Sequence, residues 1–157
     1  MEKDKLALTS ALNMIKRRWY SAHDLQLKLE KKDFEEADIQ KAIVFLKNKK
    51  MLDDVRYAKS WIKDRLNFNP KSKFLINREL KQKGISPSDI TLAWQDIEQE
   101  LDTDETEIAL NLAKRKIQTL KSLPKETQKR RLASFLARRG YSYEIIKKSL
   151  AILDNQD

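Results

Sequence analysis

The sequence of 157 residues contains no cysteine, two glycines, three prolines and one histidine. Without cysteine, neither a disulfide framework nor a thiolate metal site can form, and this composition suits a reducing compartment. So few glycines and prolines leave little material for tight turns, which argues against a many-stranded β fold. No apolar run approaches the roughly 18 residues that span a bilayer, and the N-terminus lacks a signal-peptide core. We therefore expect a soluble, cytoplasmic protein with no membrane partner.

The same scarcities argue against an enzyme. The glycines, at positions 84 and 140, lie too far apart to supply a phosphate-binding loop or a dinucleotide fingerprint. His23 is the only histidine, and it falls in the first turn of an expected helix, where a surface position is the simplest interpretation. Asp53 and Asp54 are adjacent acids that fit a double helix cap better than a metal site. We expect no catalytic, cofactor-binding or metal residues, no cofactor and no small-molecule substrate.

Helix-forming residues dominate the chain, and its apolar residues recur at helical spacing. In the first expected helix, from about Lys5 to Trp19, the inner face is predicted at Leu8, Leu12, Ile15 and Trp19. Nine such helices follow one another and group in threes. Gly84 and Gly140 each follow a helical run, as expected of residues that end a helix in the left-handed conformation. The fold class is therefore all-α.

The junction between the second and third helix of each group repeats along the chain. Its five positions recur at offsets of 51 and then 56 residues, with no gap. They are Leu29, Lys32, Asp33, Phe34 and Ile39 in the first group; Leu80, Lys83, Gly84, Ile85 and Ile90 in the second; and Leu136, Arg139, Gly140, Tyr141 and Ile146 in the third. We predict three tandem three-helix repeats, residues 1–52, 53–102 and 103–157, forming an elongated, curved body.

Charge is unevenly distributed within a formal net charge of +9. Residues 84–113 contain eight acids and no base, whereas residues 114–139 contain ten bases and Glu126 as the single acid. Charge runs commonly form a solvated face, but basic residues at the start of a helix oppose its dipole, which favours a partner-binding role. The candidates are Lys114, Arg115, Lys116, Lys129, Arg130, Arg131, Arg138 and Arg139, followed by Lys16, Arg17 and Arg18.

Three-helix units resemble helix-turn-helix DNA readers in outline, but their charge argues against groove reading. The helix in the recognition position of the middle repeat, Ser86–Leu101, is acidic and would be repelled by phosphate. Trp19, Trp61, Trp94 and Phe135 all fall on apolar faces, so no base-stacking platform is predicted. A large polar protein surface, one that carries nucleic acid, is the favoured partner. A direct nucleic-acid-binding helical repeat protein is the alternative.

Four sequence pieces, which together cover all three repeats in order, resemble the RecX family of regulators of the RecA recombinase. The pieces are Ser21-x-x-Asp24-Leu25-x-x-x-Leu29; Leu52-Asp53-Asp54-x-Arg56-Tyr57-Ala58; Ile76-x-x-Glu79-Leu80-x-x-Lys83-Gly84-Ile85; and Phe135-Leu136-x-Arg138-Arg139-Gly140-Tyr141. One stretch and one single position depart from the family pattern. Residues 69–73 replace a loop that usually contains glycine, which alters either a binding loop or only its shape. Asp33 stands where glycine is common, and Asp tolerates the left-handed region better than most residues.

The resemblance implies a non-catalytic modulator, mainly an inhibitor, of RecA in homologous recombination, DNA repair and the SOS response. Members of the family are thought to lie in the groove of the RecA filament on single-stranded DNA. There they depress ATP hydrolysis, strand exchange and co-protease activity, or promote disassembly. The expected partner is thus the RecA filament, with a weak direct contact to DNA.

Overall fold

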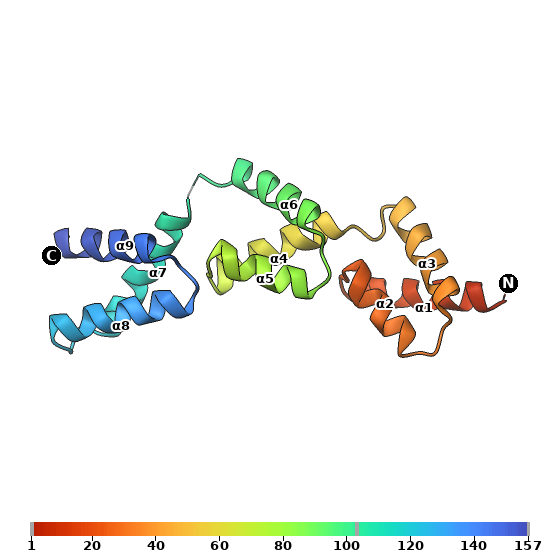
Figure 1. Ribbon diagram of the computed structural model, residues 1–157, viewed down its shortest axis with the longest axis horizontal. Coiled ribbons are helices and arrows are strands. Elements are labelled where there is room, and N and C mark those ends of the chain that lie inside the picture. The colour runs from red at the N-terminus through yellow and green to blue at the C-terminus, as the bar shows by residue number, and fades with distance from the viewer. Residues whose placement is uncertain (1, 103, 157) are drawn as a thin grey trace. The chain divides into compact units, whose positions relative to one another are not determined.

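The computed structural model describes residues 2–102 and 104–156 (Figure 1). Within these two ranges the chain forms nine helices and no strand. The helices are α1 (Glu2–Arg17), α2 (Ala22–Glu30), α3 (Glu36–Asn48), α4 (Asp54–Phe68), α5 (Lys73–Gln82), α6 (Pro87–Glu100), α7 (Glu105–Gln118), α8 (Lys125–Arg138) and α9 (Tyr143–Asn155). The all-α class and the grouping into three-helix repeats are confirmed. The repeat boundary predicted at Thr103 lies outside the described residues, and the boundary at residue 52 stays a prediction.

Side-chain caps begin several helices where the sequence predicts them. Ser21 Oγ accepts a hydrogen bond from Asp24 N at 3.1 Å, and Ser86 Oγ accepts one from Asp89 N at 3.2 Å. Before α9, Ser142 Oγ accepts from Ile145 N at 3.3 Å. Each cap satisfies one of the amides that a helix start leaves without an intrahelical partner. In the described residues no helix combines the length and the apolar character that crossing a membrane requires.

The chain divides into two compact units, each with its own core. The N-terminal unit comprises the described residues of Met1–Trp61 and Glu79–Asp96, and the C-terminal unit those of Ile62–Arg78 and Ile97–Asp157. In the N-terminal unit α1, α2 and α3 enclose Leu25, Leu29, Ile39 and Leu46, which are fully buried. Burying one such side chain contributes about 1.5–3 kcal/mol.

In the C-terminal unit α7, α8 and α9 enclose a second core (Figure 1). Ala109 and Ala113 of α7 and Leu136 of α8 are inaccessible to solvent, and Leu132 of α8 is nearly so. The two alanines let α8 and α9 approach α7 closely, because a small side chain at a contact shortens the distance between helix axes. The basic side chains of α7 and α8 therefore lie on the faces that turn away from this core.

One predicted core position is wrong. The sequence predicts Trp19 on the inner face of the first helix, but this residue is 55% exposed. The reason is that α1 ends at Arg17, so Trp19 lies beyond the helix and does not follow its apolar face. Instead the Arg56 guanidinium lies over the Trp19 ring, 5.3 Å from its centroid. Ala7 and Ala11 are the fully buried positions of α1.

Both glycine turns pack against the start of a helix in the preceding repeat. Gly84 and Gly140 have φ values of +76° and +83°, as expected of left-handed helix stops. A Cβ at Gly84 would collide with the His23 side chain, and one at Gly140 would lie 2.5 Å from Leu75 Cγ. We call the contact between Ser21–Asp24 and Lys83–Gly84 the first joint. The contact between Ser72–Leu75 and Arg139–Gly140 is the second joint.

The corresponding turn of the first repeat shows why glycine is dispensable there. Asp33 also has a positive φ, +63°, so the predicted replacement of one helix terminator by another is confirmed. Its side chain is exposed, whereas the glycines of the two joints face another helix at close range. Glycine is therefore needed at positions 84 and 140 for close approach as well as for backbone conformation.

Candidate partner-binding surface

The predicted contact residues divide between the two units. Lys114, Arg115 and Lys116 lie in the last turns of α7, and Lys129, Arg130, Arg131 and Arg138 lie on α8. Arg139 is the C-cap residue of α8, so all eight candidates of the third repeat belong to the C-terminal unit. Lys16 and Arg17 end α1 in the N-terminal unit, and Arg18 follows them.

Four arginines of the C-terminal unit are exposed and have no acidic partner. They are Arg115, Arg130, Arg131 and Arg138. Among the described residues, no carboxylate lies within ion-pair distance of any of these four side chains. Unpaired guanidinium groups on a surface are well suited to carboxylate or phosphate, which they bind through two parallel hydrogen bonds. We call these four residues the arginine surface.

Two further candidates flank an aromatic ring. The Lys116 ammonium and the Arg139 guanidinium each lie 5.2 Å from the centroid of the half-buried Phe135 ring. A cation over a ring face gains about 0.5–1 kcal/mol at exposed sites. Phe135 thus occupies its predicted position on α8 while ordering two of the basic side chains. Lys116 and Arg139 are consequently less available to a partner than the arginine surface.

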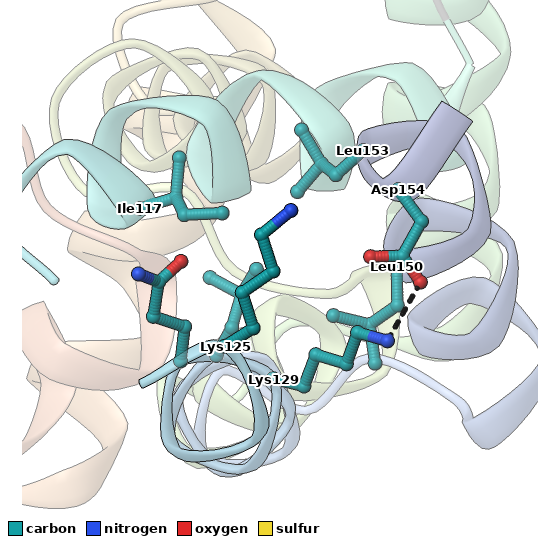
Figure 2. Close-up of a pocket in the computed structure, with 8 residues that line it drawn as sticks. Ile117, Lys125, Lys129, Leu150, Leu153 and Asp154 are labelled. Carbon is teal, nitrogen blue, oxygen red and sulfur yellow. Dashed lines mark ion pairs between the residues drawn. The ribbon is translucent and has the colours of Figure 1, made fainter. Parts of the chain in front are cut away.

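Lys129 is paired within the C-terminal unit. Its ammonium lies 3.0 Å from Asp154 Oδ2 of α9, as the dashed line in Figure 2 marks. The hydrogen bond and the charge of Asp154 raise the pKa of Lys129, so this lysine stays protonated. Its positive charge is balanced by the pair, and it adds little to the field of the surface.

Arg139 has a structural role in the second joint. Its guanidinium donates to Asn69 Oδ1 and, at 3.3 Å, to the carbonyl oxygen of Pro70. Its own carbonyl oxygen accepts a hydrogen bond from Ser72 N at 2.9 Å. Residues 69–72 are the loop part of the stretch 69–73 that departs from the family pattern, and Arg139 holds this loop. The side chain of Arg139 is half-buried as a result.

The basic residues at the end of α1 are all exposed. Lys16, Arg17 and Arg18 all face solvent, and the Arg18 guanidinium lies 4.2 Å from the centroid of the Tyr20 ring. Arg17 and Arg18 also line a hollow of about 380 Å³ together with Lys32. This second group forms a small basic site of its own in the N-terminal unit.

The acidic stretch that precedes the basic one is partly neutralised by lysines of α4 and α5. In α6, Asp96 pairs with Lys59 at 3.4 Å and Glu98 with Lys73 at 2.8 Å, while Glu100 pairs with Lys63 at 2.9 Å. The change from negative to positive charge between residues 84–113 and 114–139 is therefore less abrupt on the surface than in the sequence. The excess positive charge remains on α7 and α8.

The paired acids Asp53 and Asp54 are structural. Asp53 Oδ1 accepts from Arg56 N at 3.1 Å and so caps α4, as the sequence predicts. Asp54 Oδ1 instead accepts from Ala22 N, the first residue of α2, at 2.9 Å. Burial raises the pKa of Asp54, and the hydrogen bond from Ala22 opposes that rise. The motif around these acids thus serves the first joint.

Sequence reasoning missed two sets of surface residues. Lys121 and Lys125 line a hollow with Lys114, although the predicted set omitted them. Both lysines belong to the run of ten basic residues in 114–139, and that run was the signal that could have identified them. Phe68, Phe74 and Tyr143 are 84%, 72% and 77% exposed, respectively. Phe68 and Phe74 lie on either side of the loop at Pro70. Their place beside this loop was the only sign in the sequence that these two rings do not belong to a helical core face.

Comparisons with known proteins assign all three repeats. Family models described as the first, second and third three-helix domains of RecX match residues 7–46, 53–93 and 102–150. Regulatory protein RecX of Clostridium perfringens (strain 13 / Type A) is 37% identical over 152 residues, which cover 94% of this chain and 68% of that protein. Regulatory protein RecX of Vibrio campbellii (strain ATCC BAA-1116) is 33% identical over 145 residues, covering 92% of this chain and 90% of the relative.

Some relatives are longer than this chain. The chain spans 64% of Regulatory protein RecX of Clostridium botulinum (strain Eklund 17B / Type B), to which it is 36% identical over 140 residues. A crystal structure of RecX from Lactobacillus salivarius matches with a TM-score of 0.82, covering 98% of this chain and 97% of that one at 23% identity, which supports the fold. With three matched domains and relatives above 30% identity along most of its length, this chain belongs to the RecX family of regulatory proteins.

Proposed function

We propose that this protein is a non-catalytic regulator, mainly an inhibitor, of the RecA recombinase. It binds in the groove of the RecA filament on single-stranded DNA and depresses ATP hydrolysis, strand exchange and co-protease activity. The observation that carries the proposal is membership of the RecX family, whose relatives are named as regulatory proteins. The residues proposed to contact the filament are, first, those of the arginine surface.

The arrangement of charge supports a partner that is large and anionic. Arg115, Arg130, Arg131 and Arg138 are fixed on two helices of a packed unit, so they are held as a set rather than on mobile loops. A filament that carries nucleic acid offers both carboxylates and phosphates to such a set.

The test measures ATP hydrolysis by RecA on single-stranded DNA while the protein is added in substoichiometric amounts. We expect the wild type to lower the rate and the variant Arg130→Glu/Arg131→Glu to lose most of that effect. The matched control is Lys147→Glu/Lys148→Glu, which makes the same change of charge at two exposed residues of α9. If the wild type has no effect on hydrolysis at any ratio, the proposed function is wrong.

A direct nucleic-acid-binding protein is the second candidate, and the formal net charge of +9 favours it. This candidate predicts tight binding to bare single-stranded DNA, with an affinity that falls steeply as salt is raised. The proposed RecA regulator binds bare DNA weakly at physiological salt and gains affinity when RecA coats the strand. Fluorescence anisotropy of a labelled oligonucleotide, with and without RecA, separates the two candidates.

A further inference from the structure

Two hollows of the N-terminal unit lie beside the segment that connects α1 to α2. The larger has a volume of about 380 Å³, and we call it the cationic hollow because three basic residues line it, namely Arg17, Arg18 and Lys32. The smaller has a volume of about 110 Å³, and we call it the aromatic hollow because three aromatic residues line it, namely Trp19, Tyr20 and Tyr57. Arg18 and Tyr20 belong to both linings, so the two hollows meet at this pair.

The charges of the cationic hollow come from two separate segments. Arg17 ends α1 and is followed by Arg18, whereas Lys32 lies in the turn after α2. The Lys32 ammonium donates to Ser10 Oγ at 3.4 Å, which uses one of its three N–H groups and leaves two. The Arg18 guanidinium lies 4.2 Å from the centroid of the Tyr20 ring, which places its charge where the hollows meet. Guanidinium and ammonium groups around one hollow suit a phosphate group.

The aromatic hollow offers a ring beside a guanidinium. Trp19 is 55% exposed, and the Arg56 guanidinium lies 5.3 Å from the centroid of its ring. Aromatic rings and guanidinium planes are the surfaces on which nucleobases stack in proteins that bind single strands. Asp53 also lines this hollow, and its carboxylate caps α4 by accepting from Arg56 N at 3.1 Å. A carboxylate in the lining disfavours phosphate here, so an uncharged planar group is the better occupant.

The core of the N-terminal unit supports the walls of both hollows. Tyr20 packs against that core, and so do Met14 of the cationic hollow and Ile15 of the aromatic hollow. Leu52, which is buried, is a core residue that also lines the aromatic hollow. The distance between the cationic and the aromatic hollow is therefore set by packed side chains. A ligand that fills both must carry its anionic part and its flat part close together.

We propose that the two hollows together bind one nucleotide, with its phosphate among Arg17, Arg18 and Lys32 and its base stacked on Trp19. In a nucleotide a single sugar joins the phosphate to the base, which matches two hollows that meet at one pair of residues. An acidic peptide would supply the anion but not the flat ring. The nucleotide is either a free nucleoside phosphate or one unit of a nucleic-acid single strand.

This inference goes beyond the proposed function, because it assigns a ligand to the N-terminal unit, whereas the arginine surface lies in the C-terminal unit. Its test uses the full-length protein without RecA, so each of the two proposals can fail while the other holds. Two variants probe the two parts of the site. Arg17→Gln/Lys32→Gln removes two partners of the phosphate, and Trp19→Leu removes the ring on which the base stacks.

Each variant has a matched control. Lys5→Gln/Lys28→Gln removes the same charge from two exposed residues of the N-terminal unit that line neither hollow. Trp19→Phe keeps an aromatic ring at the stacking position. The first control tests whether the net charge alone determines binding, and the second tests whether the ring does.

The first arm titrates adenosine monophosphate against isotope-labelled protein and follows the amide resonances and the Trp19 indole N–H by NMR. We expect the indole to shift together with the amides of Arg17, Arg18 and Lys32. The dissociation constant should rise about tenfold or more in Arg17→Gln/Lys32→Gln, because two charge-assisted hydrogen bonds are lost. It should rise about tenfold in Trp19→Leu, because a stacked base contributes on the order of that factor. Both controls should stay within about threefold of the wild type.

The second arm separates the two hollows with two partial ligands. Inorganic phosphate should shift the amides of the cationic hollow but not the Trp19 indole, and adenosine should do the reverse. Each should bind more weakly than adenosine monophosphate. Equal affinities for inorganic phosphate and adenosine monophosphate would overturn the proposal. Equal losses in Lys5→Gln/Lys28→Gln, or a response to a glutamate-rich peptide without any response to adenosine monophosphate, would overturn it too.

The third arm identifies the source of the nucleotide with a short oligodeoxyadenylate at several salt concentrations. If the ligand is a single strand, the oligonucleotide binds more tightly than adenosine monophosphate. The slope of log affinity against log salt then falls in magnitude by about 1.4 in Arg17→Gln/Lys32→Gln, at about 0.7 per lost contact. If the ligand is a free nucleotide, the oligonucleotide binds no more tightly than adenosine monophosphate. Binding of both probes that is unchanged in Arg17→Gln/Lys32→Gln and in Trp19→Leu would contradict the site.

Discussion

The two joints share one backbone plan but are completed by different side chains. In both, a glycine turn packs on the start of the second helix of the preceding repeat. In both, an acid at the start of the following repeat accepts a hydrogen bond from the first amide of that helix: Asp54 from Ala22, and Glu105 from Lys73. These pairs are 51 residues apart in the sequence, which matches the first repeat offset. The joint is thus a repeated structural device.

The joints differ in which group makes the bond to the glycine turn. In the first joint the Ser21 hydroxyl donates to the Lys83 carbonyl oxygen at 2.8 Å. Ser21 Oγ also accepts from Asp24 N and so caps α2. In the second joint the backbone amide of Ser72 donates to Arg139 O, and the Ser72 hydroxyl only caps α5. The guanidinium of Arg139 adds two bonds to the loop at Asn69 and Pro70. Its counterpart Lys83 has one ion pair, with Asp24 at 3.4 Å.

This comparison shows that a repeat can keep its geometry while the stabilising interactions move from one side chain to another. The packing of the glycine turn and the hydrogen bond from the first helix amide to an acid are common to both joints, so they define the repeat. The side-chain contacts are local, so each joint should respond to substitution at a different residue. The variants below exploit that difference.

The largest effect is expected at the glycines. Gly84→Ala and Gly140→Ala should each lower the free energy of unfolding by about 3 kcal/mol, because alanine is strained at positive φ and its Cβ collides with the facing helix. Asp33→Ala is the control at a third positive φ, where the side chain is exposed, and it should cost about 1 kcal/mol or less. Urea denaturation measures all three, and similar losses would show that close approach does not matter.

The next effect separates Arg139 from Lys83. Arg139→Ala removes two hydrogen bonds of a half-buried guanidinium and should cost about 2 kcal/mol, since hydrogen bonds to charged groups contribute about 1.5–3 kcal/mol each and part of the gain is offset by solvation. Lys83→Ala removes a partly exposed ion pair and should cost less than about 1 kcal/mol. Thermal unfolding of the two variants decides the point, and a larger loss for Lys83→Ala would reverse the comparison.

For the two serines, the larger loss of stability is expected in the first joint, whereas for Arg139 and Lys83 it is expected in the second. Ser21→Ala loses both a cap and the bond to Lys83 O, which predicts a cost of about 2 kcal/mol. Ser72→Ala loses only its cap to Leu75 N and should cost about 1 kcal/mol, because the backbone bond to Arg139 remains. Equal costs in denaturant titrations would mean that the hydroxyl of Ser21 adds nothing to the first joint.

The smallest effect is a dependence on pH that both joints share. Burial raises the pKa of Asp54 and of Glu105, from ordinary values of 3.8 and 4.5. The folded state then binds more protons than the unfolded state between the ordinary and the raised pKa, so the free energy of unfolding falls as pH rises through that interval. Asp54→Asn and Glu105→Gln should each flatten this fall while keeping an acceptor for the amide. A steeper fall in either variant would contradict the assigned cause.

Much of the fold could be predicted from local signals. The serine caps, the helix stops at Gly84 and Gly140 and the repeat offsets each depend on residues a few positions apart, where propensity and spacing are informative. The joints could not be predicted, because Ser21 meets Lys83 across 62 residues, and Arg139 meets Asn69 across 70. No periodicity encodes which turn will face which helix.

The candidate surface could be predicted only in part, because local charge can be read from the sequence and long-range contacts cannot. The concentration of positive charge on α7 and α8 follows from the sequence alone. The sequence does not show which of those charges already have a partner. Asp154 pairs with Lys129, Phe135 contacts Lys116, and Asn69 accepts from Arg139, and each partner comes from another element. The contact roles of the eleven predicted residues remain predictions, and the four of the arginine surface are exposed.

The division between structural joints and a functional surface is tested most directly by inhibition of RecA ATP hydrolysis per folded molecule. Gly140→Ala and Arg130→Glu/Arg131→Glu are measured beside the wild type at a temperature where all three are folded, with unfolding monitored in parallel. We expect Gly140→Ala to lose stability but inhibit normally, and the double variant to keep its stability but inhibit poorly. Normal inhibition by the double variant, together with loss of inhibition in folded Gly140→Ala, would contradict the account.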